Sequence, residues 1–178
     1  MSVYSFYIFD RHTDCIYTKR WPTAVPSHPA PTTSKSKPST TTLTTNGSVP
    51  AATKPNTKDA DATKLIFGTI FSLRRMCRQL GGASDSFLAY RTGEYKLHYF
   101  ETPTQLKFVL LTDTRVGNMR TVLHQIWATL FVEYVVKSGL TPVGARGLAE
   151  GGKGVANELF DGGVEKFIDT IFKRDEQQ

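Results

Sequence analysis

The chain has 178 residues, a formal net charge of +6 and hydrophobic residues at 39% of its positions. No apolar run reaches the roughly 18 residues that a transmembrane helix needs, and no basic segment precedes the apolar N-terminus, so neither a membrane span nor a signal peptide is expected. The charge is scattered and no nucleic-acid-binding motif is present, which argues against a nucleic-acid partner and favours an acidic protein or an anionic membrane surface.

The first residues of the chain predict a β-hairpin. Residues 3–9, "VYSFYIF", are almost continuously apolar and aromatic, as expected of a strand covered on both faces. Residues 10–14 form a polar turn, and residues 15–21 alternate as a second strand. Cys15 in this strand and Cys77 further on lie in apolar patterns far apart, as expected of a reduced, cytosolic protein.

Residues 22–58 differ in composition from the rest of the chain. They hold seven of the nine prolines, ten threonines and five serines, and no aromatic residue. Such a segment cannot bury enough apolar surface to offset the entropy lost on ordering, so we predict a disordered insert. The remaining residues, about 140, fit one compact domain, and we expect residues 1–178 to be a single domain interrupted by this insert.

A helix is predicted next, from about Ala62 to Leu80. Asp61 can cap its start, and Gly81 with Gly82 can end it. Its core-facing stripe is expected to consist of Ile66, Ile70, Leu73, Cys77 and Leu80, and its basic side of Lys64, Arg75 and Arg78.

Three strands follow in close order, at residues 86–92, 94–101 and 106–113. The connection "TPTQ" carries Pro103 at the position where a fixed φ favours a turn. Connections this short require antiparallel neighbours, so the pattern predicts a three-strand meander.

A long helix is predicted over Asn118 to Lys137, and it is apolar on more than one side. One stripe holds Met119, Val122, Ile126 and Leu130, and the other holds Leu123, Trp127, Phe131 and Val135. One side can face the sheet, and the surplus predicts a partner chain, part of whose place a third helix of the same chain could take. We therefore predict that Trp127, Phe131 and Val135 contact a partner chain, with burial in the core of this chain as the alternative. Arg75 and Arg78 are further candidate contacts, with a solvated basic face as the alternative.

The stretch from Gly144 to Gly163 is rich in glycine. Its segment "GLAEGGKG" (147–154) approaches the phosphate-binding loop pattern, but Gly154 replaces the required hydroxyl residue and no strand precedes it, so a flexible linker is expected. A short final helix follows, with Val164, Phe167, Ile168 and Ile171 in register. The order β-β-α-β-β-β-α-α predicts an α+β fold, with a five-stranded antiparallel sheet covered by one helix on one face and two on the other.

The sequence "GEYKLHYFETPTQLKFVLLTD" (93–113) contains groups that could serve catalysis, but they do not converge. His98 would need a nearby carboxylate or nucleophile, and Glu94 and Glu101 lie about 10 Å or more from it along the strand. No histidine pair has metal-ligand spacing, and no nucleophile elbow is present. We therefore expect no catalytic residue, no metal and no cofactor.

Four segments resemble one known family in collinear order: "YSFYIFDRH", "IFGTIFSLRRM", "YKLHYFETPTQLKFVLLTD" and "VLHQIWATLFVEYVVKSGL". They are similar to the subunit 1 family of the transport protein particle (TRAPP) complex, its smallest longin-fold core subunits. The resemblance covers residues 1–21 and about 59–142, and it implies the same sheet between one helix and two.

The resemblance also implies function by assembly. It implies a non-enzymatic subunit of a vesicle-tethering complex, peripheral at ER and Golgi membranes, whose core is a guanine-nucleotide exchange factor for a Rab/Ypt-type GTPase. The implied neighbours are a second longin-type subunit and subunits of the palmitoylated TRAPP fold. Two alternatives remain at this point: another longin-type module, such as a SNARE regulatory domain or a coat adaptor subunit, and a small His98-dependent enzyme.

Overall fold

The computed structural model describes residues 2–21, 57–139 and 154–175. The predicted insert therefore lies outside the described residues, except for Thr57 and Lys58, which belong to the first helix and not to the insert. The elements are β1 (Val3–Phe9), β2 (Cys15–Arg20), α1 (Thr57–Gly81), β3 (Ala89–Arg91), β4 (Lys96–Glu101), β5 (Lys107–Thr112), α2 (Arg120–Gln125), η1 (Ile126–Val136) and α3 (Glu158–Asp175).

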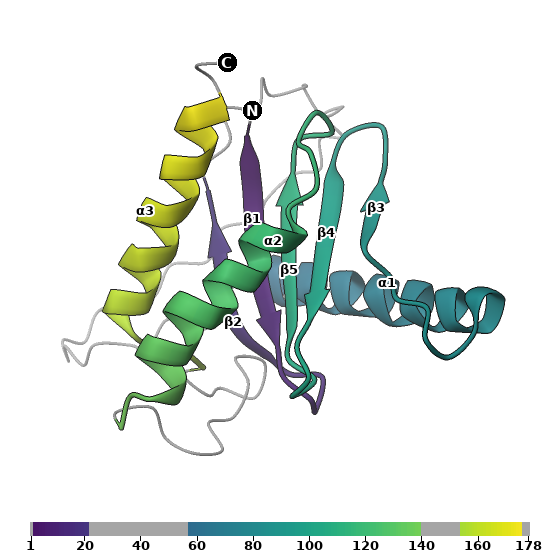
Figure 1. Ribbon diagram of the computed structural model, residues 1–178, viewed down its shortest axis with the longest axis horizontal. Helices are drawn as coiled ribbons and strands as arrows, with labels where there is room; N and C mark the ends of the chain where they lie inside the picture. Colours follow the sequence, from purple (N-terminus) through teal and green to yellow (C-terminus); the bar gives the residue numbers. More distant parts are fainter. Residues whose placement is uncertain (1, 22–56, 140–153, 176–178) are drawn as a thin grey trace, which may run out of the picture. The chain divides into compact units, whose positions relative to one another are not determined.

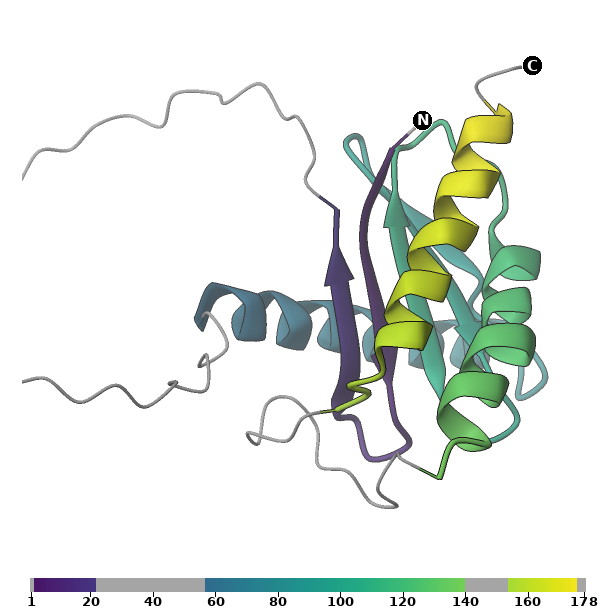
Figure 2. The same ribbon diagram turned by 90° about the vertical axis from the view of Figure 1, so that its left-hand side faces the viewer.

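The strands form one five-stranded sheet in the order β2-β1-β5-β4-β3, and every neighbouring pair is antiparallel. Helix α1 packs on one face, and α2, η1 and α3 pack on the other (Figures 1 and 2). This confirms the predicted α+β, longin-like architecture. Only the end strands β2 and β3 have an edge without a strand partner among the described residues.

Two tight connections set the register of the sheet. In the β1–β2 hairpin, one carboxylate oxygen of Asp10 accepts the backbone N–H groups of His12 (2.8 Å) and Asp14 (2.9 Å). Between β4 and β5, the backbone N–H of Gln105 donates to the carbonyl oxygen of Thr102 at 2.9 Å, with Pro103 in the second turn position. Both connections lie where the sequence predicts them.

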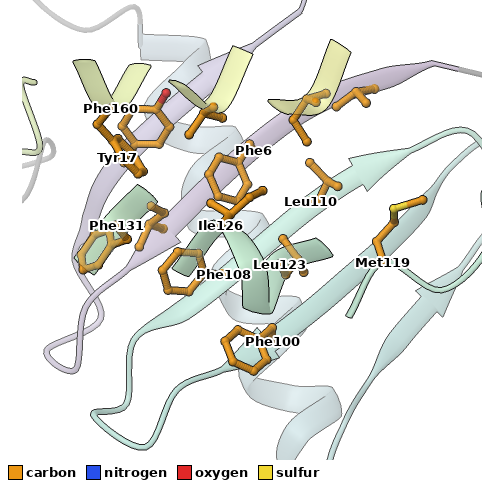
Figure 3. Close-up of a cluster of buried hydrophobic side chains, with 14 of the residues drawn as sticks. Phe6, Tyr17, Phe100, Phe108, Leu110, Met119, Leu123, Ile126, Phe131 and Phe160 are labelled. Atoms are coloured by element: carbon orange, nitrogen blue, oxygen red, sulfur yellow. The ribbon is translucent and has the colours of Figure 1, made fainter. Parts of the chain in front are cut away.

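The neighbouring strands β1 and β5 are buried on both faces, as predicted for β1. Phe6 and Ile8 of β1 belong to one apolar cluster, whereas Tyr7 and Phe9 belong to the other. The larger cluster lies between the sheet and the two-helix layer (Figure 3), and includes Phe6, Phe108, Leu110, Leu123, Ile126, Phe131 and Phe160. The ring of Phe131 meets those of Phe108 and Phe160 edge to face, a favourable geometry for aromatic pairs.

The long helix predicted over residues 118–137 is present as α2 and η1, which follow each other directly. The η1 part is π-helical, with wider turns than an α-helix. Its buried residues Ile126, Phe131 and Val135 are consequently five and four positions apart, so members of both predicted stripes face the core. The π-helical turns of η1 thus explain why the apolar surface of this helix is wider than one regular stripe.

Helix α3 begins at Glu158, so the end of the glycine-rich stretch is helical. The side-chain oxygen of Asn157 accepts the backbone N–H of Leu159 at 2.9 Å and so caps the helix start. A Cβ atom at Gly163 would stand 3.1 Å from a methyl carbon of Leu130 on η1, so glycine there permits close approach of the two helices. The region 144–153 lies outside the described residues.

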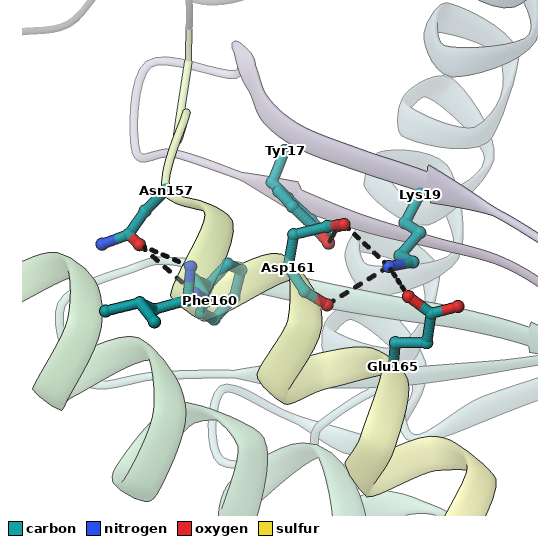
Figure 4. A network of polar contacts seen from close by, with 7 residues as sticks. Tyr17, Lys19, Asn157, Phe160, Asp161 and Glu165 are labelled. Atoms are coloured by element: carbon teal, nitrogen blue, oxygen red, sulfur yellow. Dashed lines mark hydrogen bonds and ion pairs between the residues drawn. The ribbon is translucent and has the colours of Figure 1, made fainter.

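A polar network ties α3 to strand β2 (Figure 4). The hydroxyl of Tyr17 donates to Asp161 at 2.6 Å, and the ammonium of Lys19 lies 2.9 Å from Asp161 and 3.1 Å from Glu165. Burial alone would raise the pKa of Asp161, but the hydrogen bonds from Tyr17 and Lys19 outweigh it and lower that pKa. Burial and the neighbouring carboxylate raise the pKa of Tyr17, which keeps its hydroxyl as a donor.

The packing of α3 predicts a strong contrast between two adjacent residues. Phe160 is fully buried, with its ring centroid 5.0 Å from that of Tyr17, whereas Leu159 is 68% exposed. Phe160→Ala should lower the free energy of unfolding by about 3–5 kcal/mol, because it leaves a cavity in the core. Leu159→Ala should change it by less than about 0.5 kcal/mol, as is usual for surface positions. Urea unfolding of both variants measures the difference, and equal effects would contradict the described helix register.

Candidate protein-interaction site

Among the described residues, helix α1 alone covers its face of the sheet, and it is longer than the sheet is wide. Its 25 residues span about 37 Å, whereas five strands extend across about 20 Å. Figure 1 shows α1 crossing the strands and projecting beyond β3. Ile70 is buried against the sheet, flanked by the half-buried Ile66, Leu73 and Cys77. A large part of the helix surface therefore has no cover from the described residues.

The uncovered surface of α1 carries large apolar side chains. Leu65, Met76 and Leu80 are exposed and lie within a sector of about 60° around the helix axis. We call these three residues the apolar flank. Leu80 was predicted to face the core, yet it is 83% exposed, because it lies in the last turn of the helix. Leu88, just before β3, and Tyr90, within β3, are exposed as well. Six of the eight exposed large apolar residues in the described chain therefore lie on α1 or in this β3 segment.

The other flank of α1 is basic. Arg75 and Arg78 are exposed, as the sequence predicts for a basic side, while the guanidinium of Arg74 forms a 2.7 Å ion pair with Glu101 of β4. A hollow of about 420 Å³ lies along this flank, lined by Phe71, Arg74, Arg75, Arg78, Gln79 and Ala83. A second hollow of about 410 Å³ shares Arg74 and Arg78 and extends to the β4–β5 turn and Arg120.

The predicted contact residues of the second long helix lie elsewhere. Phe131 packs against the rings of Phe108 and Phe160, and Val135 is buried in the same cluster. Part of the apolar surplus is therefore covered by α3 of the same chain, and these two side chains present little surface outward. Trp127 is half-buried, with its ring 6.1 Å from Phe100 and 5.4 Å from His124. The structure does not bring these three residues together with Arg75 and Arg78.

His98 is buried inside the sheet layer. It is 1% exposed, and its Nε2 atom lies 3.0 Å from the hydroxyl of Thr112. Desolvation, and then the nearby Lys96, lower its pKa to about 4, so the ring is neutral at pH 7. The ammonium of Lys96 in turn donates to the carbonyl oxygens of Val116 (2.9 Å) and Gly117 (3.1 Å). A ring sealed in this way cannot reach a substrate, which removes the structural basis for a His98-dependent enzyme.

Other chemistry finds little support in the parts of the chain that the structure describes. No group of three or more His, Cys, Asp or Glu side chains could hold a metal ion there. None of the helices described is long and apolar enough to cross a membrane. The segment resembling a phosphate-binding loop lies outside the described residues except for Gly154. The surface of α1 is therefore the most distinctive feature with the character of a site.

Sequence reasoning found the basic flank but missed the apolar one. The signal was present: Leu65, Phe71 and Met76 are apolar and fall outside the predicted core stripe. Isolated apolar residues at a surface are ordinary, so their clustering becomes informative only once the helix is placed on the sheet. The fold and this surface together define a small longin-like module whose distinguishing feature is a long helix with an exposed apolar flank and an exposed basic flank.

Comparison with known proteins identifies the family. The Sybindin-like family matches residues 3–171. The transport protein particle subunit bet5 of Schizosaccharomyces pombe is 34% identical over 171 residues, which cover 96% of this chain and 98% of that protein. The human trafficking protein particle complex subunit 1 is 31% identical over 173 residues, which cover 96% and 94% of the two chains. The BET5 subunit of Saccharomyces cerevisiae is 33% identical over 144 residues, which cover 80% and 77%. The chain belongs to the Sybindin-like family, as the resemblance in its sequence implied.

The buried His98 predicts a specific pH dependence of stability. Its folded-state pKa of about 4 lies below its ordinary value of 6.5, so the unfolded chain binds the proton first. The contribution of His98 is complete above about pH 6.5 and is lost as the pH falls towards about 4. His98→Gln keeps a polar group near Thr112 but does not titrate, so it should flatten the slope of unfolding free energy between those values by up to about 1.4 kcal/mol per pH unit.

Urea unfolding over this pH range measures the slope, and His12→Gln provides the control because His12 is exposed in the hairpin turn. The control should retain the slope of the original chain. If both variants have the same slope as the original chain, the burial of a neutral His98 is wrong.

Proposed function

We propose that the chain is a non-catalytic core subunit of a TRAPP vesicle-tethering complex. The observation that carries the proposal is the match, over almost the whole chain, to relatives named as subunits of that particle. Within that proposal, residues 1–178 act as one longin-like domain, interrupted between β2 and α1 by the 22–58 insert. The chain works by holding neighbours in place, and so it requires no cofactor.

The apolar flank of α1 and the outer edge of β3 are the proposed contact with a neighbouring subunit. Apolar residues gathered on one surface of a small module favour burial by another chain. Strand β3 has only three residues and pairs on one side with β4, so its other edge can accept a strand from a partner. A second longin-type subunit would offer a comparable helix and sheet edge, and palmitoylated-fold subunits would occupy other surfaces, with Trp127 as a further candidate contact.

In the assembled particle, the proposed activity is nucleotide exchange on a Rab/Ypt-type GTPase at ER and Golgi membranes. An exchange factor acts by deforming the nucleotide pocket of its partner, so it needs a shaped surface and no acid, base or metal of its own. A chain with a sealed histidine and an uncovered helix suits that role. The chain itself would associate with membranes peripherally, through the complex.

Affinity purification of the tagged full-length chain from cells, followed by mass spectrometry, tests the assignment. Other TRAPP subunits should co-purify in comparable amounts. Purification of the chain without any of them would overturn the proposed function. The nucleotide-release rate of a Rab/Ypt-type GTPase, measured with the purified complex, then tests the exchange activity.

The proposed contact predicts that Leu65→Asp combined with Met76→Asp abolishes co-purification of the adjacent subunit. The introduced carboxylates would have to be desolvated at an apolar interface, which costs several kcal/mol. Both positions are exposed, so the stability of the isolated chain should change by less than about 0.5 kcal/mol each.

Leu159→Asp is the matched control, because the exposure of Leu159 lies between those of Leu65 and Met76 but the residue lies on α3. It should leave the complex and its exchange rate unchanged. Intact assembly of the Leu65/Met76 double variant would show that α1 does not contact its neighbour through this flank.

A further inference from the structure

The basic flank of α1 forms a second surface, separate from the apolar flank and on the other side of the core-facing stripe. Its two hollows share Arg74 and Arg78 as lining residues, so they adjoin along α1 and the β4–β5 turn, and we call the two together the depression. Four arginines and one glutamate line it, a formal charge of +3. We propose that this depression binds an acidic, extended segment of a partner protein that carries one apolar anchor residue.

Glu101 is the one carboxylate among the described residues that line the depression, and each of its oxygens already accepts a hydrogen bond. One oxygen of Glu101 accepts from the guanidinium of Arg74 at 2.7 Å, and the other accepts from the hydroxyl of Tyr99 at 3.0 Å. Burial, and then the charge of Glu101, raise the pKa of Tyr99, so its hydroxyl remains a donor. Glu101 therefore neutralises Arg74 and holds it in place, but it does not reach the other arginines.

Three arginines are left to attract a ligand. Arg75, Arg78 and Arg120 have no ion pair with the described residues, although Arg120 lies 6.0 Å from the ring centroid of Phe100. In addition, the Nε atom of Arg74 is buried and has no hydrogen-bond partner in the described chain. Uncompensated guanidinium groups around a concave surface favour carboxylates, which they can bind with two parallel hydrogen bonds.

The shape of the depression favours a peptide over a membrane surface. Phe71 is 54% exposed and lines one hollow, and Phe87 and Pro103 line the other, so apolar walls alternate with charge. A flat bilayer surface would contact the outward-facing charges and leave this apolar lining unused. A peptide side chain can enter the depression, with Phe71 as its apolar contact.

The edge of the sheet adds room for an extended backbone. Strand β3 pairs with β4 only from Lys96 to His98, and the carbonyl oxygen of Leu88 accepts the backbone N–H of Tyr99 at 3.0 Å. Beyond Tyr99, no described strand lies along the outer edge of β4, and Glu101 and Pro103 line the second hollow there. An extended segment could therefore run along this edge, with its carboxylates towards Arg78 and Arg120.

Titration of the isotope-labelled full chain with a short synthetic peptide tests the proposal by NMR. The peptide has glutamate at alternate positions and a central leucine, and a second peptide replaces each glutamate with lysine. Amide signals of Arg78, Glu101 and Gln105 should shift with the acidic peptide only, and the affinity should fall as salt is added. The absence of shifts in this region would overturn the proposal.

Charge reversal identifies the residues responsible. Arg75→Glu combined with Arg78→Glu should weaken peptide binding by at least about tenfold, equivalent to about 1.4 kcal/mol. Arg115→Glu is the control, because Arg115 is exposed on the β5–α2 connection and lines neither hollow. It should change the affinity less than about twofold. Equal weakening by both variants would mean general charge attraction and would overturn the site.

Two further measurements separate the alternatives. Phe71→Ser should weaken binding of the peptide that has a central leucine. It should not weaken binding of a peptide with serine instead of that leucine, because only the leucine uses the apolar contact. Flotation with phosphatidylserine vesicles tests the membrane alternative. If the chain binds these vesicles through Arg75 and Arg78 but binds no acidic peptide, the surface recognises lipid and the proposal is wrong. Because these tests use the isolated chain, their outcome does not depend on assembly into the proposed complex.

Discussion

Strands β1 and β5 carry large apolar side chains on both faces, and this constraint shapes the rest of the molecule. Phe6 and Tyr7 are adjacent in sequence, point to opposite faces and are both almost fully buried. Burial of such a side chain contributes about 1.5–3 kcal/mol, so leaving either face uncovered would forfeit much of the stability of a small domain. The chain must therefore supply helices for both faces, and it does so unequally.

The two faces differ in how completely they are covered. On one, α2–η1 and α3 pack against each other as well as on the sheet, and the Tyr17–Asp161 hydrogen bond joins α3 to the edge strand β2. On the other, α1 is the one described helix and crosses the strands, so its apolar contacts with the sheet come from its inner stripe, with the Arg74–Glu101 ion pair beside them. The surfaces that we propose for partners are therefore a consequence of covering one face with a single long helix. Neither proposed surface requires a rearrangement of the residues packed in the core.

The predictability of each element follows from how local its determinants are. The strands and turns were predictable because alternation, Pro103 and Asp10 act within a few residues. The extent of α3 was not, because Gly162 and Gly163 disfavour a helix locally and the reason for Gly163 lies in Leu130, on another helix. The wide turns of η1 likewise mix two stripes that a regular helical period keeps apart. For the candidate site, helical spacing was enough to place Arg75 and Arg78 on one side of α1, but the exposure of Leu65 and Met76 depends on how the helix is placed on the sheet.

The two flanks of α1 would respond in opposite ways to solution conditions, which bears on how the chain could serve two partners. Contact through Leu65, Met76 and Leu80 depends on burying apolar surface, which salts such as sulfate strengthen. Contact through Arg75 and Arg78 depends on exposed charge, which salt screens over about 8 Å at physiological ionic strength. A permanent neighbour on the first flank and an exchangeable acidic segment on the second could therefore occupy one helix at the same time. Leu65, Met76 and Leu80 lie on the opposite side of the core-facing stripe from Phe71 and Arg78, so the two partners would contact different residues of the helix.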